Sequence, residues 1–165
     1  MVVFRPVGIY GPGDTRFLKL FRNVKKPMIG SGKALYHLTY IDDLVEGILK
    51  VGTTPGIEGE IFTLAGPRYT TLNELYDVIA GVLGVTKSKL KIPVWPVWIA
   101  GALCELVCRP FRVEPPIFRR RVDFFIKDRA FDITKARTRL GYDPKVDLKD
   151  GICRTAEWYR EQGLL

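Results

Sequence analysis

The chain has 165 residues, of which 47% are hydrophobic and 27% are charged. This length fits one domain of the usual ~100–200 residues, and the apolar fraction excludes an intrinsically disordered chain. The net charge is +8, with the excess divided between residues 1–34 (+6) and 106–165 (+5) around a middle part at −3. That division argues against a nucleic-acid-binding arm, which would concentrate its charge in one block.

Cysteine and histidine usage argues against a metal site. The three cysteines (Cys104, Cys108 and Cys153) lack C-x-x-C spacing, and His37 is the one histidine. We therefore expect no metal, reduced thiols and a cytoplasmic protein. Residues 1–11 do not resemble a signal peptide. The longest apolar stretch, residues 92–108, contains two prolines and Glu105 and falls short of the ~20 apolar residues of a membrane span.

The first part of the chain predicts alternating strands and helices. Residues 2–9 are rich in β-branched and aromatic residues and predict a strand buried on both faces of a parallel sheet. Asp14 or Thr15 is expected to cap a helix that reaches residue 25. A glycine turn at residues 30–32 then precedes a short strand at 37–41.

The middle of the chain continues the alternation. Asp42 is expected to cap a helix, followed by a strand over residues 61–65. Thr71 and Glu74 form a capping box, which predicts a helix that ends at Gly84. The helix after Asp42 is expected to bury one apolar face: Leu44, Val45, Ile48 and Leu49.

The last part predicts one short strand and three helices. The strand covers residues 89–92, and an apolar helix covers 95–108. Asp132 is expected to cap a short helix that ends at Gly141, and an amphipathic helix is expected over about residues 148–162. Strands and helices alternate throughout, so the predicted fold class is α/β.

Five segments resemble, in order, the extended short-chain dehydrogenases/reductases of the NAD-dependent epimerase/dehydratase family, including their 3β-hydroxysteroid-dehydrogenase-like branch. Residues 5–14 (RPVGIYGPGD) are similar to the strand and turn after the catalytic helix, and residues 40–43 (YIDD) to the start of the next helix. Residues 62–75, 131–144 and 151–159 match the remaining motifs, including the closing L-G-Y-x-P and the terminal W-Y helix.

The resemblance covers only the C-terminal half of that family. The chain has no G-x-G-x-x-G or G-x-x-G-x-x-G fingerprint and no Tyr-x-x-x-Lys. The expected fold is therefore the C-terminal substrate-binding part of a Rossmann-type enzyme, with one or two strands of the parent parallel sheet and several helices. Residues 1–165 would form this one region, in which 1–13 and 37–50 would complete the parent's nucleotide-binding domain.

The resemblance implies the substrate-binding half of an NAD(P)-dependent epimerase/dehydratase-like oxidoreductase, inactive alone. Its cofactor, NAD or NADP, would be held mostly by an N-terminal Rossmann half. The substrate would be a small molecule, either a nucleotide sugar or another alcohol or ketone. Other expected partners are that Rossmann half or a second copy of the chain. The alternatives are a non-catalytic binding module and a peripheral membrane-associated protein that uses residues 95–108.

The resemblance also implies the site residues, none of which is catalytic. Cofactor contacts are expected, mainly through backbone, at Pro6, Val7, Ile9 and Tyr10. Substrate contacts are expected at Arg16, Lys33, Tyr36, His37 and Arg129. Tyr36 and His37 replace an Arg-Asp pair of the nucleotide-sugar enzymes, which removes the bidentate fork to a diphosphate and favours a less anionic substrate.

Three other features have mainly structural interpretations. Asp42 and Asp43 are adjacent on a helix and so do not face each other as a catalytic pair. The arginines 119–121 are expected on a solvated helix face. Five residues of the apolar helix are expected on one face that serves as core or subunit contact, with a membrane surface as the alternative: Trp95, Trp98, Ile99, Leu103 and Leu106.

Overall fold

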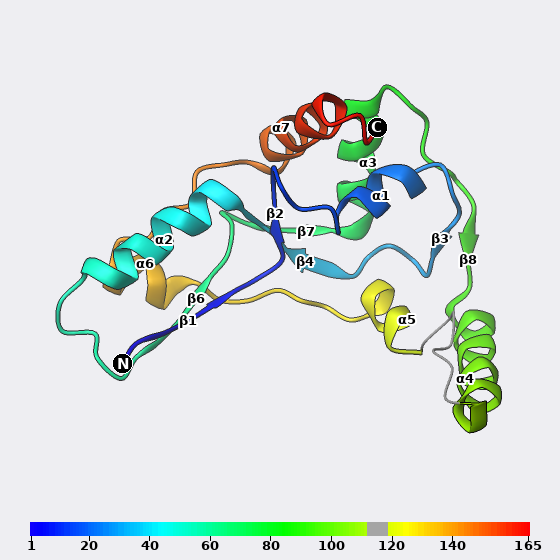
Figure 1. The fold of residues 1–165 in the computed structure, drawn as a ribbon, viewed down its shortest axis with the longest axis horizontal. Helices are drawn as coiled ribbons and strands as arrows, with labels where there is room; N and C mark the ends of the chain where they lie inside the picture. The colour runs from blue at the N-terminus through cyan, green and yellow to red at the C-terminus, as the bar shows by residue number, and fades with distance from the viewer. Residues whose placement is uncertain (112–118) are drawn as a thin grey trace.

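A computed structural model describes residues 1–111 and 119–165, apart from the side chains of Val107, 109–111 and 119–121. The fold is α/β, as predicted, and its strands form four two-stranded pairs. Figure 1 shows two groups of elements, with α2 and α6 beside β1 and β6 at one end, and α1, α3 and α7 gathered at the other.

The expected strand over residues 2–9 forms two shorter strands. β1 (Val3–Pro6) pairs in parallel with β6 (Ile61–Leu64), and β2 (Ile9–Tyr10) pairs in parallel with β5 (Thr39–Tyr40). Gly8 separates β1 from β2 with a φ of +47°, and a Cβ there would lie 2.7 Å from the carbonyl oxygen of His37. Glycine is therefore required where the chain passes from one partner strand to the next.

The other two strand pairs lie nearer the α1 end. β3 (Met28–Ile29) pairs in parallel with β8 (Lys91–Ile92), and β4 (Leu35–His37) pairs antiparallel with β7 (Tyr69–Thr71). The strand expected over residues 37–41 is therefore wrong as one element, because Leu38 separates β4 from β5. The chain changes pairing partner at that point.

The described helices largely follow the predicted order. Among them, α3 begins where the capping box predicts: the backbone N–H of Glu74 donates to Thr71 Oγ1 at 3.1 Å. Gly84 ends it with a φ of +65°. The bounds are α1 (Leu18–Asn23), α2 (Ile41–Thr53), α3 (Leu72–Leu83), α4 (Val94–Phe111), α5 (Arg119–Ile126), α6 (Thr134–Leu140) and α7 (Leu148–Glu161).

Two of the predicted helix caps, at Asp14 or Thr15 and at Asp42, are wrong. α1 begins at Leu18 with no side-chain cap, and Asp14 instead pairs with Arg16 at 3.0 Å. α2 begins after Tyr40, so Asp42 lies in its first turn. The Asp14 carboxylate instead accepts hydrogen bonds from Arg16, two residues further on, and the Asp42 side chain is exposed, so neither caps its helix.

A third predicted cap is displaced by one residue. α6 has Ile133 at its N-cap position, and Asp132 directly before it accepts a hydrogen bond from the backbone N–H of Thr134 at 2.8 Å.

The apolar side chains form two cores. The larger one packs α1, α3 and α7 together, with Phe21, Leu75, Ile79 and Tyr159 almost fully buried. The smaller one lies between β6, α2 and α6 and contains Phe62. Leu18 and Phe21 of α1 and Tyr10 of β2 all belong to the larger core, which therefore supports both elements.

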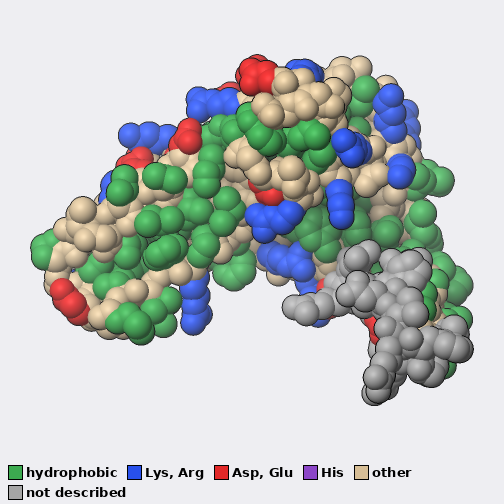
Figure 2. Space-filling view, in the orientation of Figure 1, with side chains coloured by type: hydrophobic (Ala, Val, Ile, Leu, Met, Phe, Trp, Pro, Cys, Tyr) green, Lys and Arg blue, Asp and Glu red, His purple; other side chains and the backbone are tan. Residues whose placement is uncertain are grey.

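The β1–β6 end exposes apolar residues that the sequence pattern predicts to be buried. Phe4 is 38% exposed, and Val45 and Leu49 on α2 are 47% and 62% exposed. The prediction of burial on both faces of β1 is therefore wrong, because β1 pairs with β6 alone in the described structure. Figure 2 shows hydrophobic side chains across this end of the molecule.

Helix α4 also differs from the prediction of a buried face. Trp95 and Leu106 are 68% and 69% exposed, so the expected core role is wrong. α4 lies at the edge of the molecule beside α5 (Figure 1). In the described part of the chain, no helix is long and apolar enough to cross a membrane.

Candidate functional site

Two adjoining cavities form one groove along α1, which we call the α1 groove. Their volumes are about 420 and 590 Å³, and they share Lys19, Leu20 and Phe124. The first is also lined by Pro6, Gly8, Ile9, Asp14, Arg16 and Phe17. The second is also lined by Asn23, Lys26, Pro27, Ile29, Tyr76 and Phe125.

The α1 groove begins where β1 ends. Pro6, Gly8 and Ile9 form that end of the wall, at the carboxyl end of a parallel strand. In open α/β folds, ligands bind at the carboxyl ends of the strands. The α1 groove therefore begins at the position where open α/β folds bind their ligands, at the carboxyl end of β1.

The α1 groove combines cationic side chains with an apolar interior. Arg16, Lys19 and Lys26 line one side of it, and Leu20 and Phe124 line the two cavities where they join. Figure 2 shows Lys and Arg side chains gathered over this face. The groove is therefore suited to a ligand with an anionic group and a sizeable apolar or ring-shaped body.

Of the four residues expected to contact a cofactor, two line the α1 groove and two pack into the cores. Pro6 and Ile9 line the groove, whereas Val7 packs against the smaller core. Tyr10 is buried in the larger core, where its ring lies against Gly151 of α7. Burial, followed by the nearby charge of Asp147, raises the pKa of Tyr10, and its hydroxyl therefore stays neutral.

Tyr36 and Arg129 lie together behind the groove wall. Tyr36 is 4% exposed, and its ring centroid lies 4.9 Å from that of Phe124. The Arg129 guanidinium lies over both rings, 5.8 Å from the centroid of Tyr36 and 5.4 Å from that of Phe124. Burial raises the pKa of Tyr36 to about 12, and its hydroxyl has no hydrogen-bond partner among the described residues.

His37 and Lys33 lie outside the α1 groove. His37 is buried, with Nδ1 3.0 Å from the carbonyl oxygen of Phe131 and Nε2 2.9 Å from that of Gly66. Both ring nitrogens are thus engaged by the backbone, which supports a structural histidine over a general acid. Lys33 is exposed and lines neither cavity of the groove.

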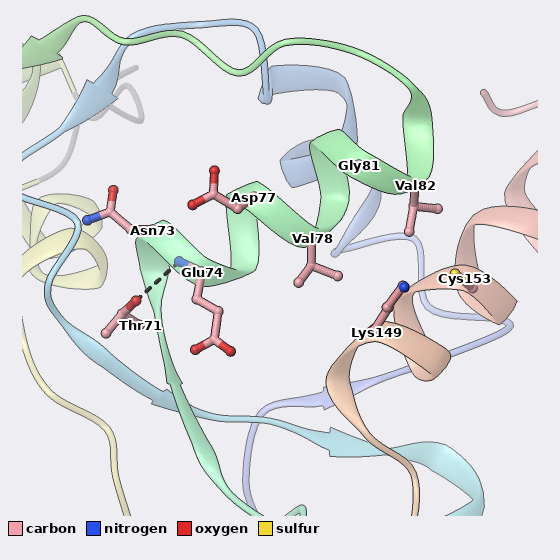
Figure 3. A pocket seen from close by; sticks show the side chains of 9 residues that line it. All are labelled: Thr71, Asn73, Glu74, Asp77, Val78, Gly81, Val82, Lys149 and Cys153. Atoms are coloured by element: carbon pink, nitrogen blue, oxygen red, sulfur yellow. Dashed lines mark hydrogen bonds between the residues drawn. The ribbon is translucent and has the colours of Figure 1, made fainter.

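A further cavity of about 700 Å³ lies between α3 and α7. Figure 3 shows Glu74 and Asp77 on α3, and Lys149 and Cys153 on α7. The acidic groups are already paired: Asp77 with Lys87 at 2.7 Å, and Glu74 with an arginine at 2.7 Å. Sequence reasoning did not identify this cavity, although the four-residue spacing of Lys149 and Cys153 places both on one helix face.

Lys19, Lys26 and Phe124 line the α1 groove but were not among the predicted site residues. Arg16, Lys19, Asn23 and Lys26 recur at spacings of three, four and three, so a polar stripe opposite the apolar one was detectable. Phe124 gave no such signal, because it comes from α5, far along the chain. Residues 1–106 and 122–165, with Cys108, contain no cluster of side chains that could hold a metal ion.

Comparison with known proteins identifies relatives across nearly the whole chain. No protein-family model matches it. The uncharacterised protein y4nL of Sinorhizobium fredii is 31% identical over 99% of the chain, which covers 48% of that protein. The decarboxylating sterol-4-alpha-carboxylate 3-dehydrogenase ERG26 of Saccharomyces cerevisiae is 30% identical over 97% of the chain, which covers 50% of that enzyme.

The chain is a relative of the extended short-chain dehydrogenases/reductases. It spans about half the length of most of the curated relatives it matches. The protein gox2253 has the same fold, with a TM-score of 0.76 at 22% identity over 99% of the chain and 50% of gox2253. The UDP-glucuronic acid 4-epimerase from Bacillus cereus, solved with NAD, gives 0.69 at 22% identity over 98% of the chain and 45% of the enzyme. The resemblance to this dehydrogenase family stated from the motifs is therefore confirmed.

Proposed function

We propose that the chain forms the substrate-binding part of an NAD(P)-dependent oxidoreductase of the extended short-chain dehydrogenase type. The observation that carries this proposal is the α1 groove, which starts at the end of β1 and places Pro6 and Ile9 beside Arg16. The wall of the groove thus contains two residues expected to contact the cofactor, Pro6 and Ile9, and one expected to contact the substrate, Arg16. The apolar surface of Pro6 and Ile9 is compatible with one face of a nicotinamide ring.

The substrate we propose is an alcohol or ketone that carries an anionic group. Arg16, Lys19 and Lys26 supply the positive charge, and Leu20 and Phe124 supply apolar contact surface. Relatives named for their substrates support this class: a sterol 4-carboxylate dehydrogenase and a UDP-glucuronic acid epimerase. Both of those substrates contain a carboxylate.

The residues of this chain would bind and orient the substrate. A nicotinamide cofactor, when bound, supplies hydride transfer at the carbinol carbon. Arg16 and Lys19 would hold the anionic end, and Phe124 would keep water from the apolar body. The proton-accepting Tyr-x-x-x-Lys motif is absent from the 165 residues, so we assign that role to a nucleotide-binding half.

That nucleotide-binding half would cover the apolar surface at the β1–β6 end. β1 pairs on one side with β6, and Phe4, Val45 and Leu49 are exposed. An uncovered strand edge with apolar side chains is a typical association surface. We propose that residues 1–13 and 37–50 complete a Rossmann domain with this partner, or else that the surface pairs with a second copy.

Ligand binding to the α1 groove tests the proposed function directly. Isothermal titration of the chain with UDP-glucuronate and with a sterol 4-carboxylate should detect binding of at least one of them. Lys19→Ala/Lys26→Ala should weaken that binding at least tenfold, since two charge-assisted contacts are removed. Lys145→Ala, an exposed lysine away from the groove, is the matched control and should leave the affinity unchanged.

A chimera tests the oxidoreductase role. The half of the yeast sterol dehydrogenase that this chain does not match would be fused ahead of β1, and NADH formation followed with both substrates. We expect turnover that the groove variant reduces and the Lys145 control does not. A folded chimera that binds NAD but oxidises neither substrate, together with no ligand binding by the chain, contradicts the proposal and favours the non-catalytic binding module.

A further inference from the structure

The cavity between α3 and α7 is separate from the α1 groove. Its volume of about 700 Å³ exceeds that of either cavity of the groove, and it shares no lining residue with them. The two helices are packed together in the larger core through Leu75, Ile79, Ile152 and Tyr159, and the cavity lies beside this contact. Small-molecule sites have volumes of about 300–1,000 Å³. The cavity therefore has the size of a ligand site that the proposed oxidoreductase function leaves unused.

Small residues keep this cavity open. Gly81 lies in the interior of α3, and a Cβ at this position would meet no atom within 4 Å. Gly81 has no positive φ, so neither a left-handed backbone nor a close contact requires glycine there. Glycine in a helix interior is destabilising relative to alanine. Its effect here is the space that it leaves beside Val78, Val82 and Cys153.

The two carboxylates that line the cavity are already paired with neighbouring cations. Asp77 pairs with Lys87 at 2.7 Å, and Figure 3 shows its side chain directed away from α7. Glu74 pairs with Arg68 at 2.7 Å and accepts a hydrogen bond from the Thr70 hydroxyl at 2.6 Å. The hydrogen bond from Arg68, followed by that from Thr70, lowers the pKa of the Glu74 carboxyl. A cationic ligand would therefore have to compete with Lys87 and Arg68.

Lys149 is the cation that lines the cavity, and its ammonium has no ion-pair partner among the described residues. Cys153 follows it by four residues and so lies on the same face of α7. Figure 3 shows the Lys149 amine and the Cys153 sulfur on the side of α7 that faces Val78 and Val82. The cavity thus combines one uncompensated positive charge with an apolar wall.

We propose that the cavity between α3 and α7 binds a small aliphatic carboxylate. The carboxylate of this ligand would pair with the Lys149 ammonium, a charge-assisted contact that fixes one end. Its alkyl chain would lie against Val78 and Val82, in the space beside Gly81, and would add affinity in proportion to its length. An inorganic anion lacks the apolar part, and an alkylamine would bring a second positive charge to Lys149.

Calorimetric titration of the chain with a series of carboxylates tests the proposal. We expect affinity to rise from butyrate through hexanoate to octanoate, by up to about fourfold for each methylene group. Octylamine should bind more weakly than octanoate. Octylamine that binds as tightly as octanoate would overturn the proposal, and so would an affinity that does not depend on chain length.

Alkylation of the cysteines reports where the carboxylate binds. Cys153 lines the cavity, whereas Cys104 and Cys108 lie on α4. Octanoate should slow the alkylation of Cys153 by iodoacetamide, measured by peptide mass spectrometry, and leave the rates at the two α4 cysteines unchanged. If all three cysteines are protected equally, octanoate associates with exposed apolar surface in general and the assignment to the cavity is overturned. An unchanged rate at Cys153 under saturating octanoate also overturns it.

Two substitutions with matched controls separate the charge from the space. Lys149→Met should weaken octanoate binding about tenfold, because the charge-assisted contact is lost, whereas Lys145→Met outside the cavity should not. Gly81→Leu should fill the cavity and abolish the protection of Cys153. Gly52→Leu is its control, because Gly52 lies in α2 and a Cβ there also meets no atom within 4 Å. All four variants should keep the circular dichroism spectrum of the parent, and parent-like octanoate binding by either cavity variant would overturn the proposal.

The α1 groove is also cationic and apolar, so it is the competing site for octanoate. Lys19→Ala/Lys26→Ala should bind octanoate as the parent does and should still protect Cys153. Loss of octanoate binding in this variant would place the carboxylate in the α1 groove and contradict the second site. The result is independent of the proposed oxidoreductase function, because the two sites have no residue in common.

Discussion

The carboxylate of Asp43, on α2, accepts a hydrogen bond at 3.0 Å from the backbone N–H of Val146, 103 residues further along the chain. Its other oxygen accepts one from the N–H of Lys145, also at 3.0 Å. Asp43 is 4% exposed, so it joins α2 to the segment that leads into α7. The two adjacent aspartates of residues 40–43 (YIDD) therefore have different roles. Asp43 holds two segments together, whereas the side chain of Asp42 is exposed to solvent.

Removing this carboxylate should destabilise the fold. Asp43→Ala leaves two backbone N–H groups without an acceptor, and each such group costs about 1–3 kcal/mol when buried. We expect the free energy of unfolding to fall by about 2–4 kcal/mol, as measured by urea denaturation. Asp42→Ala is the matched control, because its side chain is 68% exposed and lies 3.9 Å from Arg154. If both variants lose the same free energy of unfolding, the two hydrogen bonds of Asp43 do not stabilise the fold more than an exposed aspartate does.

The glycine turn before β4 should tolerate alanine poorly. Gly32 has a φ of +71°, and a Cβ there would lie 2.5 Å from both Asn73 Oδ1 and Met28 Sδ. Gly56 has a nearly identical φ of +72° with no atom within 4 Å of its Cβ position. Gly56→Ala therefore measures backbone strain alone, about 1 kcal/mol, whereas Gly32→Ala adds a steric clash of about 1–3 kcal/mol. Thermal unfolding of the two variants separates these contributions; similar melting temperatures would contradict the predicted clash.

Local sequence signals predicted the fold well where neighbours in the chain decide the structure. Thr71, Glu74 and Gly84 fix both ends of α3, because capping and left-handed glycine involve residues only a few positions apart. The apolar periodicity of α2 gave a wrong prediction at Val45 and Leu49, which it predicts to be buried and which are exposed in the structure. Burial depends on what covers a helix, and the periodicity of one element does not contain that information.

The candidate site was predictable only in part, for the same reason. The motif at residues 5–14 contains Pro6 and Ile9, which line the α1 groove together with Arg16. Their contacts with cofactor and substrate stay predictions. The groove also needs Phe124, which reaches α1 through the fold and gives no signal in the local sequence. His37 was selected by its place in a motif, yet its two backbone partners become visible only in three dimensions.

High pH should unfold the chain through its buried tyrosines. Burial raises the pKa of Tyr36 and of Tyr159 to about 12, and it also raises the pKa of Tyr142. A phenol whose pKa is higher in the folded than in the unfolded chain stabilises the fold below its ordinary pKa of ~10, and this contribution is lost as the pH rises through 12. Phenolate absorbance at 295 nm should therefore rise together with loss of circular dichroism between pH 10 and 12. Ionisation of every tyrosine near pH 10 with no loss of structure would contradict this.

Replacing Tyr36 by phenylalanine should separate stability from ligand binding. The Tyr36 hydroxyl is buried and has no partner among the described residues, so Tyr36→Phe should leave the free energy of unfolding unchanged or raise it by about 1 kcal/mol. Phe124 lines the α1 groove, and its ring centroid lies 4.9 Å from that of Tyr36. We expect Phe124 to shift when a ligand binds and the Tyr36 hydroxyl then to donate a hydrogen bond to that ligand. Ligand affinity in the titrations should accordingly fall about threefold to tenfold for Tyr36→Phe, the range of one neutral hydrogen bond. A gain in stability with unchanged affinity would make Tyr36 a packing residue only, and a marked loss of stability would show that its hydroxyl has a partner in the free chain.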